Sequence, residues 1–170
     1  MNTQADIDFG KELRKAIRAD DVETVVTLLT ERPHLLNANA DTPFGTLLHI
    51  AASAGSLDVT RKLLEMGADI DKRGGALDAG PLTLAVSSGQ IEIVKYFLSQ
   101  GATFDLSEPY RNPLFSAIYN DRLAIVKLLI AHGIDYSIRY SGDVMKETDA
   151  LAHAENLGKT DIVGFLRSLA

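Results

Sequence analysis

The sequence predicts an all-α fold in which short helix–turn–helix units stack into a solenoid. Three observations support this: a segment recurs along the chain, apolar residues inside each copy have helical spacing, and turn-forming residues separate the helices. The clearest copies are LHIAASAGSLDVTRKLLEMGA, LTLAVSSGQIEIVKYFLSQGA and LFSAIYNDRLAIVKLLIAHGI. LRKAIRADDVETVVTLL and LAHAENLGKTDIVGFL continue the pattern toward the two ends of the 170 residues. Five units of about 33 residues are therefore expected.

An anchor alanine, three residues after the leading leucine, fixes the register of the five copies. The anchors are Ala16, Ala51, Ala85, Ala117 and Ala154, at steps of 35, 34, 32 and 37 residues. We expect one domain over residues 1–170, with repeats over residues 9–40, 41–73, 74–105, 106–137 and 138–170. A single helical pair cannot bury its apolar face, so the units must stack and leave one extended concave face.

The first helix of a unit is expected to start at a capping residue. Thr46, Asn112 and Asp149 occupy equivalent positions two residues before the leading leucine, and Pro81 and Pro113 occupy the next position. Such residues favour a helix start because their oxygens accept free backbone N–H groups, while proline has no N–H to leave unsatisfied. The leading leucines are expected in the core: Leu48, Leu82 and Leu114.

The turn between the two helices of a unit is predicted to need a positive φ angle. Glycine fills it in three units, at Gly55, Gly89 and Gly158, and aspartate in the other two, at Asp20 and Asp121. Both residue types tolerate the left-handed region. Second helices are expected to end at Gly67, Gly101 and Gly133,.

The segment TLLHIAASAG resembles the T-P-L-H-x-A-A-x-x-G signature of ankyrin repeats, and LDVTRKLLEMGAD resembles their second helix and loop. A tetratricopeptide array has a similar period, but extended loops after glycine-terminated helices favour the ankyrin family. The resemblance implies hairpin-like loops between units. It also implies a structural role for His49, bonded to backbone and to Thr46. Thr83, Phe115 and Ala152 replace this histidine in later units.

Composition and motifs exclude several functional classes. There is no cysteine, and the net charge of −6 opposes binding to nucleic acid or anionic membranes,. The polar N-terminus MNTQADIDFG lacks the basic start and apolar stretch of a secretory signal, so a cytoplasmic location is expected,. The chain is expected to act as a monomer.

We expect no catalytic residues, no metal ligands and no cofactor. DIDKRGG begins like a calcium loop, but Arg73 and Gly80 stand where oxygen ligands are needed,. Gly75 and Gly80 have phosphate-loop spacing, but Pro81 and Leu82 follow instead of lysine and a hydroxyl residue,. Three histidines are expected at the solvated surface: His34, His132 and His153.

Ankyrin proteins generally bind protein partners through loop tips and the concave side of the first helices, and the resemblance carries this to specific residues. The expected partner-binding residues are Phe44, Lys72, Arg73, Leu77, Asp78, Tyr110, Arg111, Tyr119, Tyr140 and Lys146. On the first helices, the equivalent exposed positions are Arg18, Ser53, Ser87, Tyr119 and Asn156. Tyrosine and arginine are enriched among residues that dominate interface energetics. The segment SIRYSGDVMKETD departs most from the repeat pattern, so it is either a partner-specific loop or a longer C-terminal cap.

The expected function is a non-enzymatic module that binds and occludes a partner protein. The chain resembles stand-alone bacterial ankyrin proteins, some of which are immunity proteins that block a toxin. The acidic balance favours a partner with a basic surface, through electrostatic steering,. A scaffold or adaptor with no inhibitory role is the alternative.

Overall fold

The chain folds into the expected helical pairs. The computed structural model describes residues 4–39, 44–142 and 145–169. Within them the first helices of the pairs are α1 (Gln4–Arg18), α3 (Leu47–Ala54), α5 (Pro81–Ser88), α7 (Pro113–Tyr119) and α9 (Ala150–Asn156). The second helices are α2 (Val22–Glu31), α4 (Leu57–Glu65), α6 (Ile91–Ser99), α8 (Leu123–Ala131) and α10 (Thr160–Arg167). A single 3₁₀ turn, η1 (Pro33–Leu35), follows α2.

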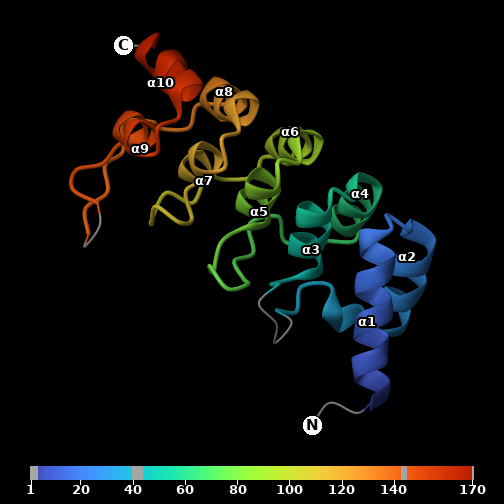
Figure 1. Cartoon of the computed structure of the whole chain (residues 1–170). Coiled ribbons are helices and arrows are strands. Elements are labelled where there is room, and N and C mark those ends of the chain that lie inside the picture. The colour runs from blue at the N-terminus through green and yellow to red at the C-terminus, as the bar shows by residue number, and fades with distance from the viewer. Residues whose placement is uncertain (1–3, 40–43, 143–144, 170) are drawn as a thin grey trace.

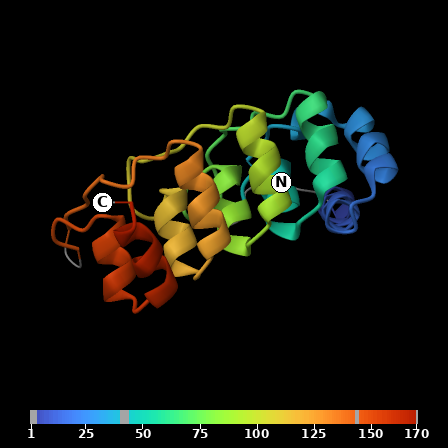
Figure 2. The same ribbon diagram turned by 90° about the horizontal axis from the view of Figure 1, so that it is seen from above.

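The helices form two parallel rows. The first helices lie in one row and the second helices in the other, and the two ends of the chain lie at opposite ends of the stack (Figures 1 and 2). Each helix contacts its equivalent in the next repeat, as in the contacts of α3 with α5 and of α4 with α6. The loops between repeats project from the side of the first helices (Figure 1). The predicted all-α solenoid is therefore confirmed.

The core runs unbroken along the stack between the two rows. The three leading leucines, Leu48, Leu82 and Leu114, are buried as predicted. The anchor alanines are also buried, and the four from Ala51 onward are fully inaccessible. A larger side chain there would separate the two helices of a repeat, so the small anchor sets their close approach.

The turns inside the repeats tie each repeat to the next one. Asp20 and Asp121 adopt the left-handed region, with φ of 55° and 58°. The Asp20 carboxylate accepts hydrogen bonds from the backbone N–H groups of Val59 (2.8 Å) and Asp58 (3.3 Å), at the start of α4. Gly55 has φ of 85°, and a Cβ atom there would lie 2.7 Å from the Gln90 side-chain oxygen. Both turn residues are therefore constrained by the neighbouring repeat as well as by their own φ.

Two of the inter-repeat loops are short hairpins. Gly74 pairs with Ala79 in one antiparallel bridge, and Tyr140 pairs with Thr148 in another. The predicted boundary between residues 40 and 41 lies outside the described residues, as do residues 143 and 144 of the segment SIRYSGDVMKETD.

The last repeat presents an ion pair at its outer end. Glu155 and Arg167 are joined at 2.7 Å. They occupy the positions that Ile118 and Ile130 fill in the preceding repeat, where Ile118 is fully buried. The polar pair makes this face of the last described repeat more suited to contact with water than the corresponding face of the preceding repeat.

None of the helices in the described part of the chain combines the length and the apolar run that crossing a bilayer requires.

We expect Leu82→Ala to lower the free energy of unfolding by about 2–5 kcal/mol, because it leaves a cavity in the middle of a continuous core. Urea denaturation followed by circular dichroism measures the change. Leu157→Ala is the matched control, since the Leu157 side chain is 37% exposed and its removal creates no cavity. An unchanged midpoint for Leu82→Ala would contradict the packing described above.

Candidate functional site

The concave side of the solenoid contains a groove between the first helices and the hairpin of residues 74–79. Its volume is about 560 Å³. Residues of α1, α3 and α5 form its floor, namely Arg18, His49, Ile50, Ser53, Ala54 and Leu84. Its rim comes from Phe44 and from Gly74, Gly75, Ala76 and Leu77 of the hairpin. The volume lies in the range of specific binding sites, and the lining is mainly apolar.

Exposed hydrophobic side chains lie at the groove and further along the same side. Leu77 is 51% exposed at the tip of the hairpin. Phe44 lies on the rim, and the centroid of its ring is 5.9 Å from Arg18 Cζ. Tyr110 is exposed in the following loop, and Tyr119 is 65% exposed at the end of α7. These four predicted residues are therefore accessible to a partner, as are Lys72 and Lys146.

His49 connects the groove floor to the hairpin of the next repeat. Its Nδ1 accepts a hydrogen bond from the Thr46 backbone N–H at 3.2 Å and lies 2.8 Å from Thr46 Oγ1. Nε2 must therefore carry the proton, which it donates to the Ala79 carbonyl oxygen at 2.9 Å,. Burial lowers the pKa of His49 below its ordinary value of 6.5, although the bond to Ala79 opposes this shift. The neutral ring thus joins a helix start to the adjacent hairpin.

Thr83 makes the equivalent connection one repeat later. It follows Leu82 as His49 follows Leu48, and its Oγ1 donates to the Arg111 carbonyl oxygen at 2.8 Å. Ala79 and Arg111 each lie three residues before a leading leucine, so the two side chains reach equivalent carbonyl groups. A histidine and a threonine at the same repeat position therefore make the same kind of hydrogen bond to the loop of the next repeat.

Aromatic packing replaces this hydrogen bond at the next position. The Phe115 ring stacks on His153 with centroids 4.5 Å apart, and its other neighbour is the edge of Tyr140 at 4.9 Å. The expectation that His153 is solvated is wrong: it is only 8% exposed, because Phe115 covers it. Burial lowers the His153 pKa below 6.5, against a hydrogen bond with the Phe115 backbone that raises it.

Tyr140, which the sequence predicts to contact a partner, makes several contacts within the fold. Its hydroxyl donates to the Leu106 carbonyl oxygen at 2.9 Å and accepts from Asn112 Nδ2 at 3.0 Å. Burial raises the Tyr140 pKa above its ordinary value of 10.0, although the bond from Asn112 opposes this shift. With its ring packed on Phe115 and its hydroxyl bonded twice, Tyr140 has little to offer a partner.

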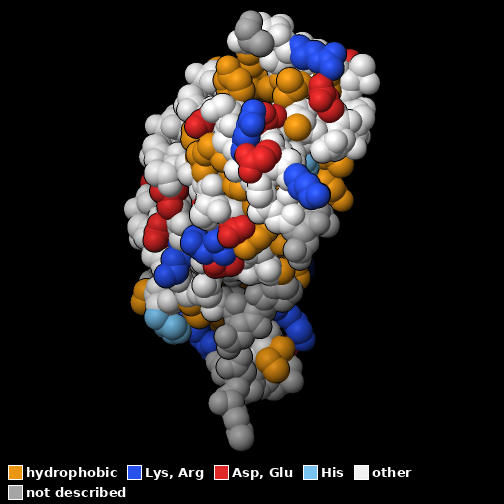
Figure 3. All heavy atoms as spheres, turned by 90° about the vertical axis from the view of Figure 1, so that its left-hand side faces the viewer, with side chains coloured by type: hydrophobic (Ala, Val, Ile, Leu, Met, Phe, Trp, Pro, Cys, Tyr) orange, Lys and Arg blue, Asp and Glu red, His pale blue; other side chains and the backbone are white. Residues whose placement is uncertain are grey.

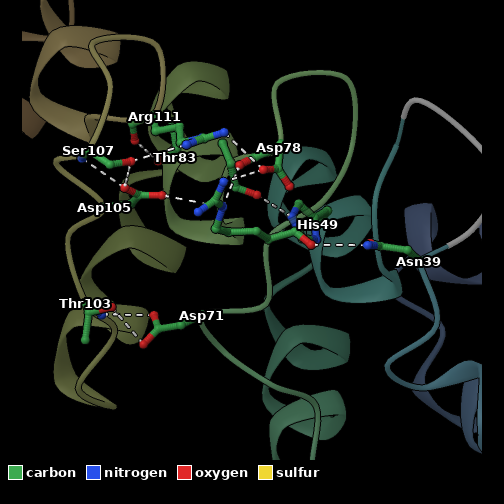
Figure 4. A network of polar contacts seen from close by, with 11 residues as sticks. Asn39, His49, Asp71, Asp78, Thr83, Thr103, Asp105, Ser107 and Arg111 are labelled. Carbon is green, nitrogen blue, oxygen red and sulfur yellow. Dashed lines mark hydrogen bonds and ion pairs between the residues drawn. The ribbon is translucent and has the colours of Figure 1, made fainter.

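Three of the five charged residues predicted to bind a partner, Arg73, Asp78 and Arg111, form an ion-pair network with one another (Figure 4). Asp78, at the hairpin tip with φ of 46°, pairs with Arg73 and also with Arg111 Nη2 at 3.0 Å. Arg111 also donates to Ser107 Oγ at 3.3 Å, and its side chain is only 16% exposed. Arg73 Nε lies 3.8 Å from Asp105 Oδ2. The network holds the hairpin of residues 74–79 against the loop of residues 105–112.

The pKa values within this network follow from its geometry. Burial raises the pKa of Asp105, but hydrogen bonds from Ser107 and the charges of Arg73 and Arg111 outweigh it, so the net shift is downward from 3.8. The hydrogen bond to Asp78 raises the pKa of Arg73. The lowered pKa of Asp105 and the raised pKa of Arg73 both favour the charged forms of these two side chains near neutral pH. Arg73, Asp78 and Arg111 therefore support the loops, and their contact with a partner stays a prediction.

Five groove residues were not singled out by sequence reasoning: Ile50, Ala54, Gly74, Ala76 and Leu84. Ile50 and Leu84 each precede an anchor alanine by one residue, so the register could have identified them. Ala76 could not have been found in this way because its position depends on the path of the hairpin. Among the described residues, no three acidic or histidine side chains gather closely enough to hold a metal ion.

Comparisons with known families agree with the repeat architecture. The family model described as ankyrin repeats (3 copies) matches residues 74–140, and the one described as ankyrin repeats (many copies) matches residues 48–98. Together they span residues 48–140, more than half of the chain. The helical pairs α3 to α8 lie within this span.

Curated proteins from distant organisms are similar to the chain over limited stretches. A transient receptor potential cation channel subfamily A member 1 homolog of Caenorhabditis elegans is 30% identical over 132 residues, which is 78% of this chain and 11% of that protein. The phosphocholine transferase AnkX of Legionella pneumophila is 33% identical over 121 residues, 70% of this chain and 12% of the transferase. A putative ankyrin repeat protein of Rickettsia felis is 34% identical over 103 residues, 56% of this chain and 44% of that protein. The chain thus spans less than half the length of each.

We expect the free energy of unfolding to fall as the pH decreases from about 7 to about 5. His49 and His153 have pKa values lowered below 6.5 in the fold. Below pH 6.5 the unfolded chain therefore binds protons that the folded chain does not, which favours unfolding by up to about 1.4 kcal/mol per pH unit for each histidine. Asp21, Asp105 and Asp135, whose pKa values are lowered from 3.8, affect stability only in a more acidic range.

Urea denaturation at a series of pH values tests this expectation. His153→Phe keeps an aromatic ring against Phe115 but removes the titrating group, so it should reduce the slope of stability against pH. His34→Gln, at an exposed position, should leave the slope unchanged. A wild-type stability that is flat over this interval would show that the two rings are not held neutral by the fold.

We expect Thr83→Val to lower the free energy of unfolding by about 1–3 kcal/mol, because it leaves the Arg111 carbonyl without its donor inside the loop layer. Thr103→Val is the control, since the Thr103 hydroxyl also bonds across repeats, to Asp71 at 2.9 Å, but at an exposed site where water can replace it. Equal effects of the two substitutions on the melting temperature would mean that the buried Thr83 hydrogen bond contributes no more to stability than the exposed Thr103 hydrogen bond.

Proposed function

This chain belongs to the ankyrin repeat family, whose fold is a protein–protein interaction module, and we propose that it binds its partner through the groove and the adjacent loop tips. The observation that carries this proposal is the coincidence of a groove of about 560 Å³ with exposed apolar side chains on one side of the solenoid. Soluble domains rarely expose such side chains together unless they bind something.

The proposed contact residues are those that the fold leaves accessible. Leu77 and Phe44 stand at the groove, and Tyr110 and Tyr119 extend the surface toward the C-terminal repeats. Large apolar and aromatic side chains supply most of the binding energy in protein interfaces. The paired charges of Arg73, Asp78 and Arg111 support this proposal indirectly, because they fix the hairpin that carries Leu77.

Occlusion of the partner is the first of two modes of action that we consider. A partner lying along the concave side would have its bound surface covered over several repeats, which suits an inhibitor or immunity-type role. The second mode is scaffolding within a larger assembly. It is favoured by the relatives from Caenorhabditis elegans and Legionella pneumophila, of which this chain matches only 11% and 12%. The activity of the partner in a stoichiometric complex distinguishes the two: it falls under occlusion and persists under scaffolding.

Affinity capture from a lysate of the natural source tests the contact surface. We expect Leu77→Ser combined with Tyr119→Ser to weaken the capture of a partner by at least about tenfold, since truncating a central contact costs more than about 1 kcal/mol and two are removed. Bound proteins are identified by mass spectrometry and the affinity of the purified partner is then measured.

The control removes exposed apolar side chains that do not line the groove. Tyr136→Ser combined with Leu157→Ser changes residues of comparable character, 39% and 37% exposed. This variant should capture the partner as the wild type does. Equal capture by all three proteins would place the contact surface elsewhere on the solenoid, and no captured protein at all would count against a protein-binding role.

A further inference from the structure

The floor of the groove changes character from one repeat to the next. One residue before the anchor alanine, the first three repeats place Lys15, Ile50 and Leu84, of which Ile50 and Leu84 line the groove. Two residues after the anchor they place Arg18, Ser53 and Ser87, of which Arg18 and Ser53 line it. Helix α1 therefore brings a cation to both positions where α3 and α5 bring an apolar or a hydroxyl side chain.

The cations of α1 next to the groove are available for binding. Lys15 and Arg18 are exposed, and in the described part of the chain neither side chain has a carboxylate partner. Lys11, by contrast, pairs with Asp8 at 3.3 Å. From Lys11 to Arg18, helix α1 carries four basic residues against one carboxylate, Glu12. The end of the groove at α1 is therefore positively charged.

The rest of the floor carries no compensating negative charge. The sequences of α3, LLHIAASA, and α5, PLTLAVSS, contain no acidic residue, and neither does that of α7, PLFSAIY. Among the described residues, Asp78, which follows the rim residue Leu77, pairs with Arg73 and Arg111. On the side of the molecule drawn in Figure 3, acidic and basic side chains lie side by side in small groups, with hydrophobic patches between them.

The net charge of −6 comes mainly from the turns and loops. The first helices carry four acidic and four basic residues, and the second helices carry six acidic residues against five basic ones. The overall negative charge favours a basic partner at long range, whereas the cations of α1 favour an acidic segment at the groove. Salt screens distant charges more than near ones, so the cations of α1 decide which segment lies against the floor.

We propose that the groove recognises a segment of the partner that combines an apolar side chain with adjacent carboxylates. The apolar side chain lies between Ile50, Leu77 and Leu84, and the carboxylates lie toward Lys15 and Arg18 on α1. This inference rests on the proposed function and adds to it the chemistry of the partner. The overall composition favours a partner with a basic surface, whereas this proposal expects an acidic and apolar surface on the partner where it contacts the groove.

Selection of random short peptides by the full chain tests the proposal. Peptides retained at low salt should be enriched in aspartate or glutamate next to leucine, isoleucine or phenylalanine, and raising the salt concentration should weaken them because exposed ion pairs are screened. Lys15→Gln combined with Arg18→Gln should weaken a selected peptide by about fivefold to tenfold, as expected for the loss of two exposed ion pairs. Both side chains are exposed, so the variant should keep its melting temperature.

The matched control neutralises two cations on the second helices. Arg61→Gln combined with Lys127→Gln changes the net charge equally, and both side chains lie over aromatic rings as Arg18 does. This variant should bind the selected peptide within about twofold of the wild type. An equal loss in both variants would mean that only the overall charge matters and would overturn the proposal.

The remaining outcomes separate this inference from the proposed function. One outcome is a set of selected peptides without acidic enrichment, whose binding is weakened by Leu77→Ser but not by Lys15→Gln with Arg18→Gln. This outcome overturns the inference and leaves the protein-binding groove in place. Enrichment of basic peptides does the same. If no peptide is selected while octanoate, a small apolar carboxylate, raises the melting temperature, the groove belongs to a small molecule and both proposals are wrong.

Discussion

The structure depends on hydrogen bonds that run from the first helix of one repeat to the loop of the next. A buried carbonyl group without a donor lowers stability, and a loop that leaves the helical layer has fewer backbone donors within reach. His49 donates to the Ala79 carbonyl group, which also accepts the Gly74 N–H, and Thr83 donates to the Arg111 carbonyl group. Each bond thereby fixes the start of the following helix. Where Phe115 removes the donor, packing with Tyr140 and His153 takes its place. Because each bond joins two repeats, neighbouring repeats hold one another in position.

The same connections determine which surface residues remain available. Asp78 has to compensate two guanidinium groups, so the hairpin of residues 74–79 is held rigidly but offers no free charge at its tip. Leu77, carried by that rigid hairpin, is exposed beside the groove. A preorganised apolar contact binds without first losing conformational entropy. Charge recognition is then left to α1, where Lys15 and Arg18 have no carboxylate partner in the described part of the chain.

Sequence reasoning succeeded wherever one residue determines its own local structure. The φ angles at Asp20 and Asp121, the helix starts at Thr46 and Asn112, and the buried leading leucines all follow from local sterics, capping and apolar spacing. It failed for His153, which was expected at the solvated surface, and it did not anticipate the contacts of Tyr140 within the fold. Their burial depends on Phe115, which belongs to a different repeat from either of them, and no spacing within a single repeat reveals that contact.

The sequence by itself determined the period, the helical pairs and the family, because these depend on interactions repeated in every copy and are therefore visible as a pattern. Only the tertiary structure decided which charges are free. The sequence does not distinguish Arg73 and Arg111, which pair with Asp78, from Arg18, which lines the groove without a carboxylate partner in the described part of the chain. The physical reason is that ion pairing depends on distances between loops of different repeats, which are fixed by how the repeats stack.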